Sequence, residues 1–223
     1  MNDEQGYKIK WLETKGRALA AYHHLLTPLC RFSIHGREHT TKALASGRPL
    51  LFVFWHGQIT PMLLYLNRFW DPTQYVMVTL GGDDRGVILA QFARSMRATP
   101  FAVDMDGNPM AAGRSVLRII QEMKRGKHSF IAPDGPGGPA GVLKPGALYL
   151  AKKARAVIVP AGAYGRPAYN LRRWDRYNLP LPFSRVHIEL GAPIFPQKNA
   201  DETELAARLT TTLHLLQQRA RGE

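Results

Sequence analysis

Two short segments of this 223-residue chain carry the residues best suited to chemistry, and each follows an apolar run. His56 comes directly after LFVFW, and Asp134 comes directly after FIAP and opens the turn DGPGGP. Apolar runs of this length predict buried strands. In an open α/β sheet, the carboxyl ends of such strands border one crevice. The two segments therefore predict a single cleft that contains both His56 and Asp134.

His56 is a candidate general base, because a neutral imidazole can take a proton from a substrate hydroxyl near neutral pH. The alternative is a structural histidine held by hydrogen bonds in the core. The next two residues, Gly57 and Gln58, favour the catalytic interpretation. A glycine lets a substrate come close to the backbone, and a glutamine side chain can polarise a carbonyl group.

The turn that follows Asp134 is a candidate binding site for an anion or an oxyanion. Gly135, Gly137 and Gly138 leave backbone amides open in a tight turn. Lys144 stands at the start of the next predicted helix and adds a cation beside that helix's N-terminal amides. The turn matches neither a phosphate-binding P-loop nor a dinucleotide fingerprint. A purely structural turn is the alternative.

A third segment, GGDDRG at 81–86, also follows a predicted strand. Its two acids, Asp83 and Asp84, would lie at the same edge of the sheet as His56. The alternative is a helix-capping aspartate within an ordinary turn.

The net charge of +13 predicts an anionic partner. Three classes of partner have this charge: nucleic acid, an acidic membrane face and a phosphate-bearing substrate. Between Lys144 and His187 the chain has nine Lys or Arg residues and one acid, Asp175, with aromatic residues interleaved. A solvated basic face is the alternative. The chain has no recognised RNA- or DNA-binding motif, so we expect an anionic membrane lipid and no nucleic acid as the partner.

Composition also limits the location and the reaction class. The single cysteine, Cys30, cannot form a disulfide within the chain, which favours a reducing, cytoplasmic environment. The N-terminus has no signal-peptide core, and no apolar stretch reaches the length of a membrane-spanning helix. We therefore expect contact with lipid only from the surface. Neither a serine-hydrolase elbow nor a metal-ligand spacing occurs.

Apolar runs alternate with helical patterns, which predicts one α/β domain with a largely parallel sheet flanked by helices. Strands are expected at 31–36, 49–54, 74–80, 100–104, 128–133, 156–164 and 185–190, and helices at 57–68, 85–96, 111–126, 145–154 and 201–220. Prolines and polar residues at 165–184 predict a loop.

Residues 8–27 predict a basic amphipathic helix that ends before Pro28. This divides the chain into an N-terminal helical segment at 1–30 and an α/β domain at 31–223. The helix could lie in a bilayer interface or pack on the domain core.

Three segments resemble conserved blocks of the lysophospholipid acyltransferase superfamily. ALASGRPLLFVFWHGQ resembles the first block, FIAPDGPGGPAGVLKPG the third and AVIVPAGAY the fourth. WHG and DGP-GP, in this order and spacing, resemble a small bacterial branch long catalogued as a domain of unknown function. The resemblance extends from about residue 31 to residue 195. It implies a glycerolipid acyltransferase-like α/β fold.

The chain departs from the superfamily at the position that normally orients the histidine. The wider family has an aspartate five residues after the histidine, and here Pro61 stands five residues after His56. We expect Asp83 or Asp84 to supply the missing carboxylate from a neighbouring strand end.

Two further departures concern substrate binding. The second motif of the family offers an arginine where this chain has Val103 and Asp104, and Arg114 is the nearest basic substitute. Asp134 stands where many members have glutamate.

The resemblance implies a bacterial acyltransferase, peripheral on the inner face of the cytoplasmic membrane. It would move a fatty acyl chain from acyl-CoA or acyl carrier protein to a hydroxyl of a (lyso)phospholipid or lipid A-type acceptor, with no bound cofactor. His56 would be the base and Gln58 would stabilise the oxyanion, while Asp134, Lys144 and Arg114 would hold the acceptor.

The alternative is a non-catalytic protein that binds anionic lipid and retains the fold. A carboxylate within hydrogen-bond reach of His56, in a cleft that also holds Asp134, favours catalysis. A His56 sealed in the core favours the binding protein.

Overall fold

The centre of the fold is a sheet of seven strands in the computed structural model, which describes residues 3–103, 108–197 and 201–222. The strands are β1 (Arg31–His35), β2 (Leu50–Val53), β3 (Tyr75–Leu80), β4 (Thr99–Val103), β5 (His128–Ile131), β6 (Val157–Asn170) and β7 (Asn178–Leu190). They lie in the order β1-β7-β6-β2-β5-β3-β4. All neighbours pair in parallel except β6 and β7, which form an antiparallel hairpin. The predicted α/β domain with a largely parallel sheet is confirmed.

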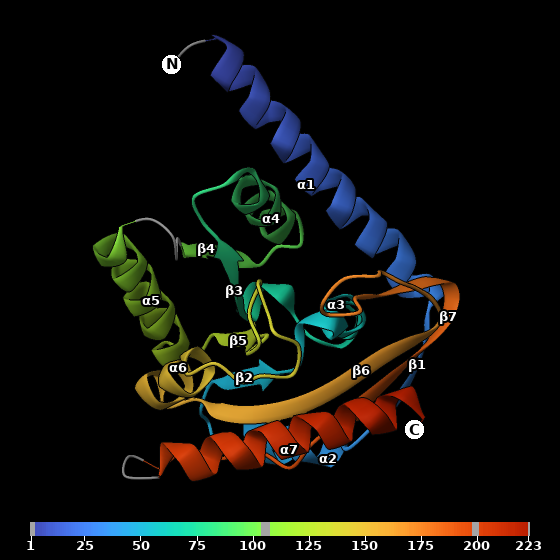
Figure 1. Ribbon diagram of the computed structural model, residues 1–223, viewed down its shortest axis with the longest axis vertical. Helices are drawn as coiled ribbons and strands as arrows, with labels where there is room; N and C mark the ends of the chain where they lie inside the picture. The colour runs from blue at the N-terminus through green and yellow to red at the C-terminus, as the bar shows by residue number, and fades with distance from the viewer. Residues whose placement is uncertain (1–2, 104–107, 198–200, 223) are drawn as a thin grey trace.

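Helices cover both faces of this sheet (Figure 1). They are α1 (Asp3–Leu29), α2 (Arg37–Leu44), α3 (Ile59–Phe69), α4 (Asp84–Ser95), α5 (Pro109–Lys124), α6 (Gly146–Ala154) and α7 (Glu202–Arg221), with short 3-10 turns at His56–Gln58 and Pro72–Gln74. Helices α1, α3 and α4 contribute to the core on one face, and α5, α6 and α7 to the core on the other. The short helix α2 was not predicted.

Strand β2 shows how the core positions the site. It lies between β6 and β5, and all of its residues are buried. Leu50 and Phe52 face the core beneath α1, α3 and α4, whereas Leu51 and Val53 face the opposite core. A strand buried on both faces needs a continuous apolar run, which this segment provides. His56 therefore emerges at the carboxyl end of a strand that is held on four sides.

Residues 165–184 form regular structure where the sequence predicted a loop. Strand β6 continues to Asn170 and β7 begins at Asn178, so only residues 171–177 connect them. Between Asn178 and Ser184, strand β7 pairs only with β6, and among the described residues no third strand lies beside this distal part of the hairpin. Prolines are tolerated in such a ribbon because no further neighbour needs their missing N–H groups. The proline-based prediction of a loop was wrong for this reason.

The remaining differences from the predicted elements are small. Helix α1 continues through Pro28 and ends at Leu29. Strand β4 ends at Val103, and Asp104, which the sequence assigned to this strand and to the second-motif position, lies outside the described residues.

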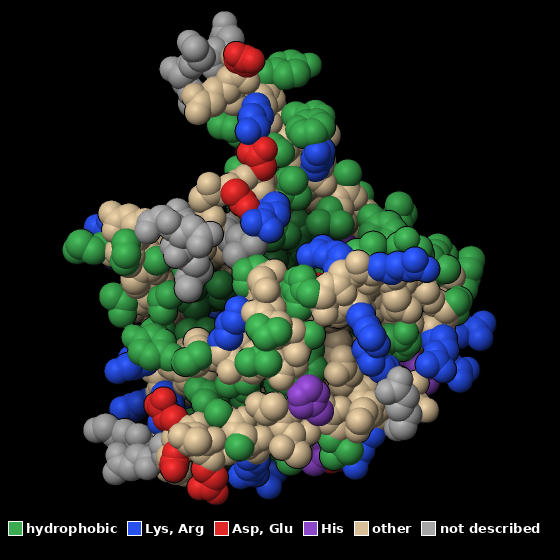
Figure 2. Space-filling view, in the orientation of Figure 1, with side chains coloured by type: hydrophobic (Ala, Val, Ile, Leu, Met, Phe, Trp, Pro, Cys, Tyr) green, Lys and Arg blue, Asp and Glu red, His purple; other side chains and the backbone are tan. Residues whose placement is uncertain are grey.

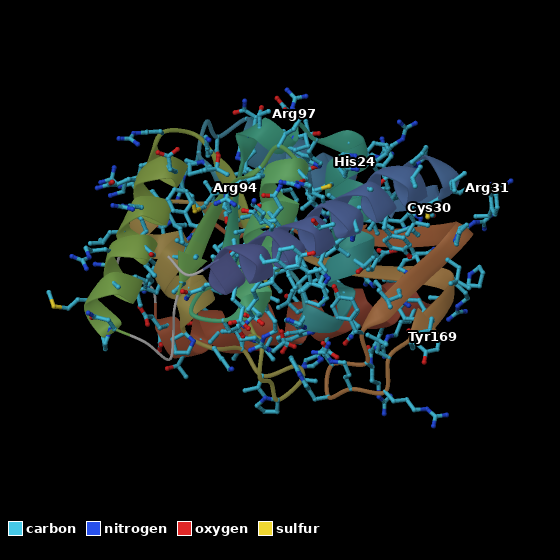
Figure 3. All side chains as sticks on the ribbon, turned by 90° about the horizontal axis from the view of Figure 1, so that it is seen from above. His24, Cys30, Arg31, Arg94, Arg97 and Tyr169 are labelled. Atoms are coloured by element: carbon cyan, nitrogen blue, oxygen red, sulfur yellow. The ribbon has the colours of Figure 1, made fainter. Side chains whose placement is uncertain are left out.

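Helix α1 packs on the domain with its C-terminal half and projects from it with its first turns (Figure 1). Leu12, Ala20 and Leu26 are buried against the core. Seen from above, α1 lies across the domain, with His24 on the side of α4 (Figure 3); its Nε2 lies 3.5 Å from the carbonyl oxygen of Ser95. Within residues 3–103, 108–197 and 201–222, no helix combines the length and hydropathy needed to cross a bilayer.

His23, on α1, is expected to make stability depend on pH. Its side chain is buried beside the ring of Phe92. Burial first, and the neighbouring His24 second, lower the pKa of His23 from 6.5 to about 4. Between these values the folded protein binds fewer protons than the unfolded chain, so this contribution to stability is complete above pH 6.5 and is lost as the pH falls toward 4.

The substitution His23→Leu is expected to remove this part of the pH dependence. Because one pKa unit corresponds to about 1.4 kcal/mol, up to roughly 3 kcal/mol of the stability lost on acidification belongs to His23. Urea unfolding at several pH values between 7 and 4 measures it in both proteins. Parallel curves for wild type and variant would contradict the assignment.

Candidate active site

The imidazole of His56 faces a carboxylate from a distant part of the chain. Its Nδ1 lies 2.8 Å from Oδ2 of Asp175, in the loop between β6 and β7. The Asp175 side chain is fully buried, while 19% of the His56 side chain is exposed. A carboxylate on Nδ1 holds the N–H tautomer there and leaves Nε2 free to accept a proton. The pair has the arrangement of a general base and its orienting acid.

The expected partners of His56, Asp83 and Asp84, are engaged elsewhere. Asp83 caps α4 by accepting a hydrogen bond from the backbone N–H of Gly86, and it accepts another from Nε of Arg85. The Arg85 hydrogen bond is the largest cause of the lowered pKa of Asp83. Asp84 pairs with Lys8 of α1 at 3.0 Å. The prediction that either acid orients His56 was wrong, because both serve the start of α4.

Gly57 brings Asp175 into position. A Cβ atom at Gly57 would lie 2.1 Å from the backbone carbonyl oxygen of Asp175, so only glycine allows the two segments to approach so closely. The sequence predicted that a substrate approaches the backbone at Gly57. In the structure, the group that approaches Gly57 is the backbone of Asp175, whose carboxylate orients His56.

The substitution Gly57→Ala is therefore expected to displace Asp175 from His56. A displacement of about 1 Å in a catalytic group can lower a rate by about 10²-fold. If His56 is a catalytic base, kcat measures the effect, with Gly113→Ala on α5 as the control, because no neighbouring atom lies within 4 Å of a Cβ at Gly113. A Gly57→Ala protein with wild-type kcat would contradict this role.

Asp134 is tied to the backbone of His56, as the two apolar runs predicted. Its Oδ1 accepts a hydrogen bond from the His56 N–H at 3.0 Å, and its Oδ2 accepts one from the Gly141 N–H at 3.4 Å. The side chain is buried, and this burial raises the pKa of Asp134. Asp134 therefore joins the turn after β5 to the turn that carries the histidine.

Trp174 connects the glycine-rich turn to the histidine. Its ring lies beside the imidazole of His56, with the centroids 5.2 Å apart and the two planes tilted by 39°. Gly138 has a φ of 67°, and a Cβ there would lie 2.7 Å from the Trp174 ring. The glycine-rich turn therefore packs against the aromatic neighbour of His56. At Gly135 an added Cβ would meet Nζ of Lys144 at 3.0 Å, whereas Gly137 has no neighbour within 4 Å.

A cavity of about 160 Å³ opens beside this pair. Its walls include Gly57, Asp134, Trp174, Asp175 and Arg176. His214 and Gln217 of α7 complete one side. The cavity is bordered by the carboxylate that orients His56 and by the acid of the glycine-rich turn. Two segments that the sequence singled out therefore meet at one cleft, together with a loop that it did not.

Of the predicted site residues, all of which the structure describes except Asp104, Gly57 and Asp134 belong to the walls of this cavity. The walls do not include His56, whose orienting acid Asp175 lines the cavity, nor do they include Gln58, Lys144 and Arg114. Gln58 is buried, with its Oε1 accepting a hydrogen bond from the Ala163 N–H and its Nε2 without a partner among the described residues. That burial does not fit the predicted contact with a substrate carbonyl. Lys144 and Arg114 are exposed, Arg114 on α5.

Sequence reasoning missed His214 and Gln217 of α7 and, nearest to His56, the residues of the loop at 171–177. Trp174 is an aromatic neighbour of His56, and Asp175 is its orienting acid. Arg176 places a cation in the cavity wall. One signal was present in the sequence. Asp175 is the single acid among nine basic residues between Lys144 and His187.

Among the comparisons with known proteins, the one with solved structures bears on the fold. No model of a known protein family matches the sequence. The chain is 24% identical over 147 residues to an uncharacterised protein of Rickettsia prowazekii (strain Madrid E), an alignment that covers 65% of this chain and 63% of that protein. Among solved structures, it is similar to the 1-acyl-sn-glycerophosphate acyltransferase PlsC of Thermotoga maritima. The TM-score is 0.56 at 16% identity, over all of this chain and 84% of that one. This protein thus has the α/β fold of the glycerolipid acyltransferase PlsC.

Proposed function

We propose that this protein is a membrane-associated acyltransferase. It moves a fatty acyl chain from acyl-CoA or acyl carrier protein to a hydroxyl of a (lyso)phospholipid or lipid A-type acceptor. The observation that carries the proposal is the hydrogen bond of 2.8 Å between Nδ1 of His56 and the buried Asp175. The likeness of the fold to an acyltransferase supports the same class of reaction.

The chemical step uses the free nitrogen of His56. Nε2 takes the proton of the acceptor hydroxyl as the hydroxyl oxygen attacks the thioester carbonyl carbon. Asp175 stabilises the imidazolium that forms. When the tetrahedral intermediate collapses, the C–S bond breaks and the imidazolium returns the proton to the thiolate. The products are an acyl ester and a free thiol, and the thioester itself supplies the activated acyl group.

The geometry favours this enzyme over the non-catalytic alternative. His56 is partly exposed and has a carboxylate within hydrogen-bond reach, and the adjoining cavity contains Asp134. A lipid-binding protein has no need to bury an acid against one nitrogen of an exposed histidine, because burying a charge is costly.

The surface of α1 supports action at a membrane. Tyr7 and Trp11 are 79% and 54% exposed on the projecting part of the helix, and Ile9 is also exposed. Nζ of Lys15 lies 3.4 Å from the centroid of the Trp11 ring. Aromatic rings flanked by lysines suit the interface of an anionic bilayer, where each basic residue contributes roughly 1 kcal/mol. We propose that the protein binds the inner face of the cytoplasmic membrane from the cytoplasm.

Acyl transfer to a total bacterial lipid extract tests the proposed function. Radiolabelled acyl-CoA and acyl carrier protein serve as donors in separate reactions, and chromatography identifies the labelled lipid. A labelled product supports the proposal and names donor and acceptor. Folded protein that binds anionic vesicles but forms no labelled lipid with either donor would favour the lipid-binding alternative.

A further inference from the structure

A second, larger cavity lies beside the proposed active site. It has a volume of about 580 Å³ and is formed by the distal part of the β6–β7 hairpin and the C-terminal end of α7. Its walls include Tyr164 and five arginines, Arg166, Arg172, Arg173, Arg176 and Arg221. Figure 2 shows Lys and Arg side chains gathered over this region of the molecule. We refer to it as the arginine cavity.

The arginine cavity has very little compensating negative charge. Among the described residues, no carboxylate lies within 4.0 Å of the guanidinium groups of Arg166, Arg172, Arg176 or Arg221, whereas Nε of Arg173 lies 3.8 Å from Oδ1 of Asp175. Like charges held together repel one another, and a bound anion relieves that repulsion. The cluster therefore has the electrostatics of an anion site.

The loop that carries three of these arginines is held in a fixed shape. The Leu171 N–H donates to the carbonyl oxygen of Tyr177, and the Arg176 N–H donates to that of Arg173. Arg176 has a φ of 46°, a left-handed conformation that is unusual for a residue other than glycine. Fixing the loop in advance reduces the entropy that a ligand must remove on binding.

The opposite wall is ordered around one aromatic ring. The guanidinium groups of Arg166 and Arg221 lie 5.7 and 5.6 Å from the centroid of the Tyr164 ring. Arg166 also donates a hydrogen bond of 2.8 Å to the backbone carbonyl oxygen of Arg221. These contacts hold two cations in place while leaving most of their N–H donors available.

We propose that the arginine cavity binds a ligand portion that carries two or more phosphate groups. A guanidinium group matches a phosphate with two parallel hydrogen bonds, and five such groups exceed what one phosphate can engage. Two sources have this chemistry: the nucleotide portion of coenzyme A, and a lipid headgroup with two phosphates. The placement of this ligand in acyl transfer rests on the proposed function, but its binding does not.

The arginine cavity borders the smaller cavity of the proposed active site. Arg176 and Arg221 line both cavities, and Arg173 reaches the carboxylate that orients His56. A ligand anchored by its phosphates in the larger cavity would therefore extend toward the histidine. Whichever of the two ligands binds there, the nucleotide portion of a donor or the headgroup of an acceptor, would use this route.

Isothermal titration calorimetry with small phosphates tests the proposal. The probes are inorganic phosphate, pyrophosphate, adenosine 3′,5′-bisphosphate as the donor fragment and a sugar bisphosphate as the headgroup fragment. The variant Arg172→Gln/Arg176→Gln removes two exposed arginines of the cavity. The control Arg94→Gln/Arg118→Gln removes the same charge from exposed positions on α4 and α5. Arg94 is well separated from Tyr169, at the distal part of the hairpin, in Figure 3.

We expect wild type to bind pyrophosphate at least tenfold more tightly than phosphate. The affinity for pyrophosphate is expected to fall at least tenfold in the cavity variant and to stay within twofold of wild type in the control. The bisphosphate that binds more tightly identifies the source. Equal affinity of pyrophosphate for wild type and cavity variant, with both folded by circular dichroism, would overturn the proposal, as would a failure of wild type to distinguish pyrophosphate from phosphate. The single substitution Arg172→Gln repeats the test if the double variant does not fold.

The outcome is separable from that of the proposed function. Binding is measured without turnover, and His56→Ala is expected to bind pyrophosphate as wild type does. Loss of pyrophosphate binding in the cavity variant, together with no acyl transfer by wild type, would support the anion site and contradict the proposed acyltransferase activity. Acyl transfer by wild type, with unchanged pyrophosphate binding in the cavity variant, would support the activity and contradict the anion site.

Discussion

The substitution His56→Ala is expected to lower kcat for acyl transfer by about 10⁴-fold. Without the imidazole, the acceptor hydroxyl has no group to take its proton as it attacks the thioester, and general-base catalysis by a positioned side chain contributes up to about 10⁴-fold. The side chain of His56 is partly exposed, so the fold is expected to remain intact. Initial rates of labelled lipid formation at saturating donor give kcat for both proteins.

The matched control for this variant is His39→Ala. His39 lies on α2, and its Nε2 is 3.9 Å from an exposed glutamate, Glu38. It is expected to retain wild-type kcat. If His56→Ala retained kcat as well, the base would have to be another group and the proposed mechanism would fail.

The substitution Asp175→Asn is expected to lower kcat by about 10³- to 10⁴-fold. The amide has nearly the same shape as the carboxylate, but it can present an N–H to Nδ1 of His56 and it carries no charge. His56 would then place its proton on Nε2, where the base must be unprotonated, and the imidazolium would lose its stabilising anion. The same assay measures the effect, and the melting temperature shows whether the fold persists.

The variants Asp83→Asn and Asp84→Asn are the controls for this prediction. Both residues lie at the start of α4 and have their own partners, so each is expected to retain kcat. A large loss of kcat in either control, together with a wild-type kcat for Asp175→Asn, would show that Asp83 or Asp84 is the partner of His56, as the sequence predicted.

The sequence could place His56 and Asp134 together because local chemistry determined both positions. Each follows an apolar run that forms a strand in the middle of the sheet, and neighbouring parallel strands end at the same edge of the sheet. The hydrogen bond from the His56 N–H to Asp134 results directly from that arrangement. Periodicity and run length were sufficient for this part of the site.

Asp175 could not be placed in the same way. It lies 119 residues after His56, in a loop whose position depends on the β6–β7 hairpin. The prolines in that hairpin predicted a loop where the structure has strands. Sequence patterns extend over short distances, so the nearer acids, Asp83 and Asp84, were predicted as partners of His56. The pairing is a tertiary contact, and no local propensity encodes it.

Gly57 illustrates a residue whose importance was predicted with the wrong reason. A glycine beside a candidate base indicates a close approach, but the sequence does not say of which group. The structure shows that the approaching group is the backbone of Asp175. The glycine and the distant aspartate therefore belong to one arrangement.

The central claim is that His56 and Asp175 act as one catalytic unit, and a double-mutant cycle tests it most directly. Acyl transfer is measured for wild type, His56→Ala, Asp175→Asn and the double variant under identical conditions. Residues that act together show strongly non-additive effects. We expect the double variant to be no slower than His56→Ala, because Asp175 acts only through the imidazole. If the two rate losses instead multiplied in the double variant, the residues would act independently and the claim would be wrong.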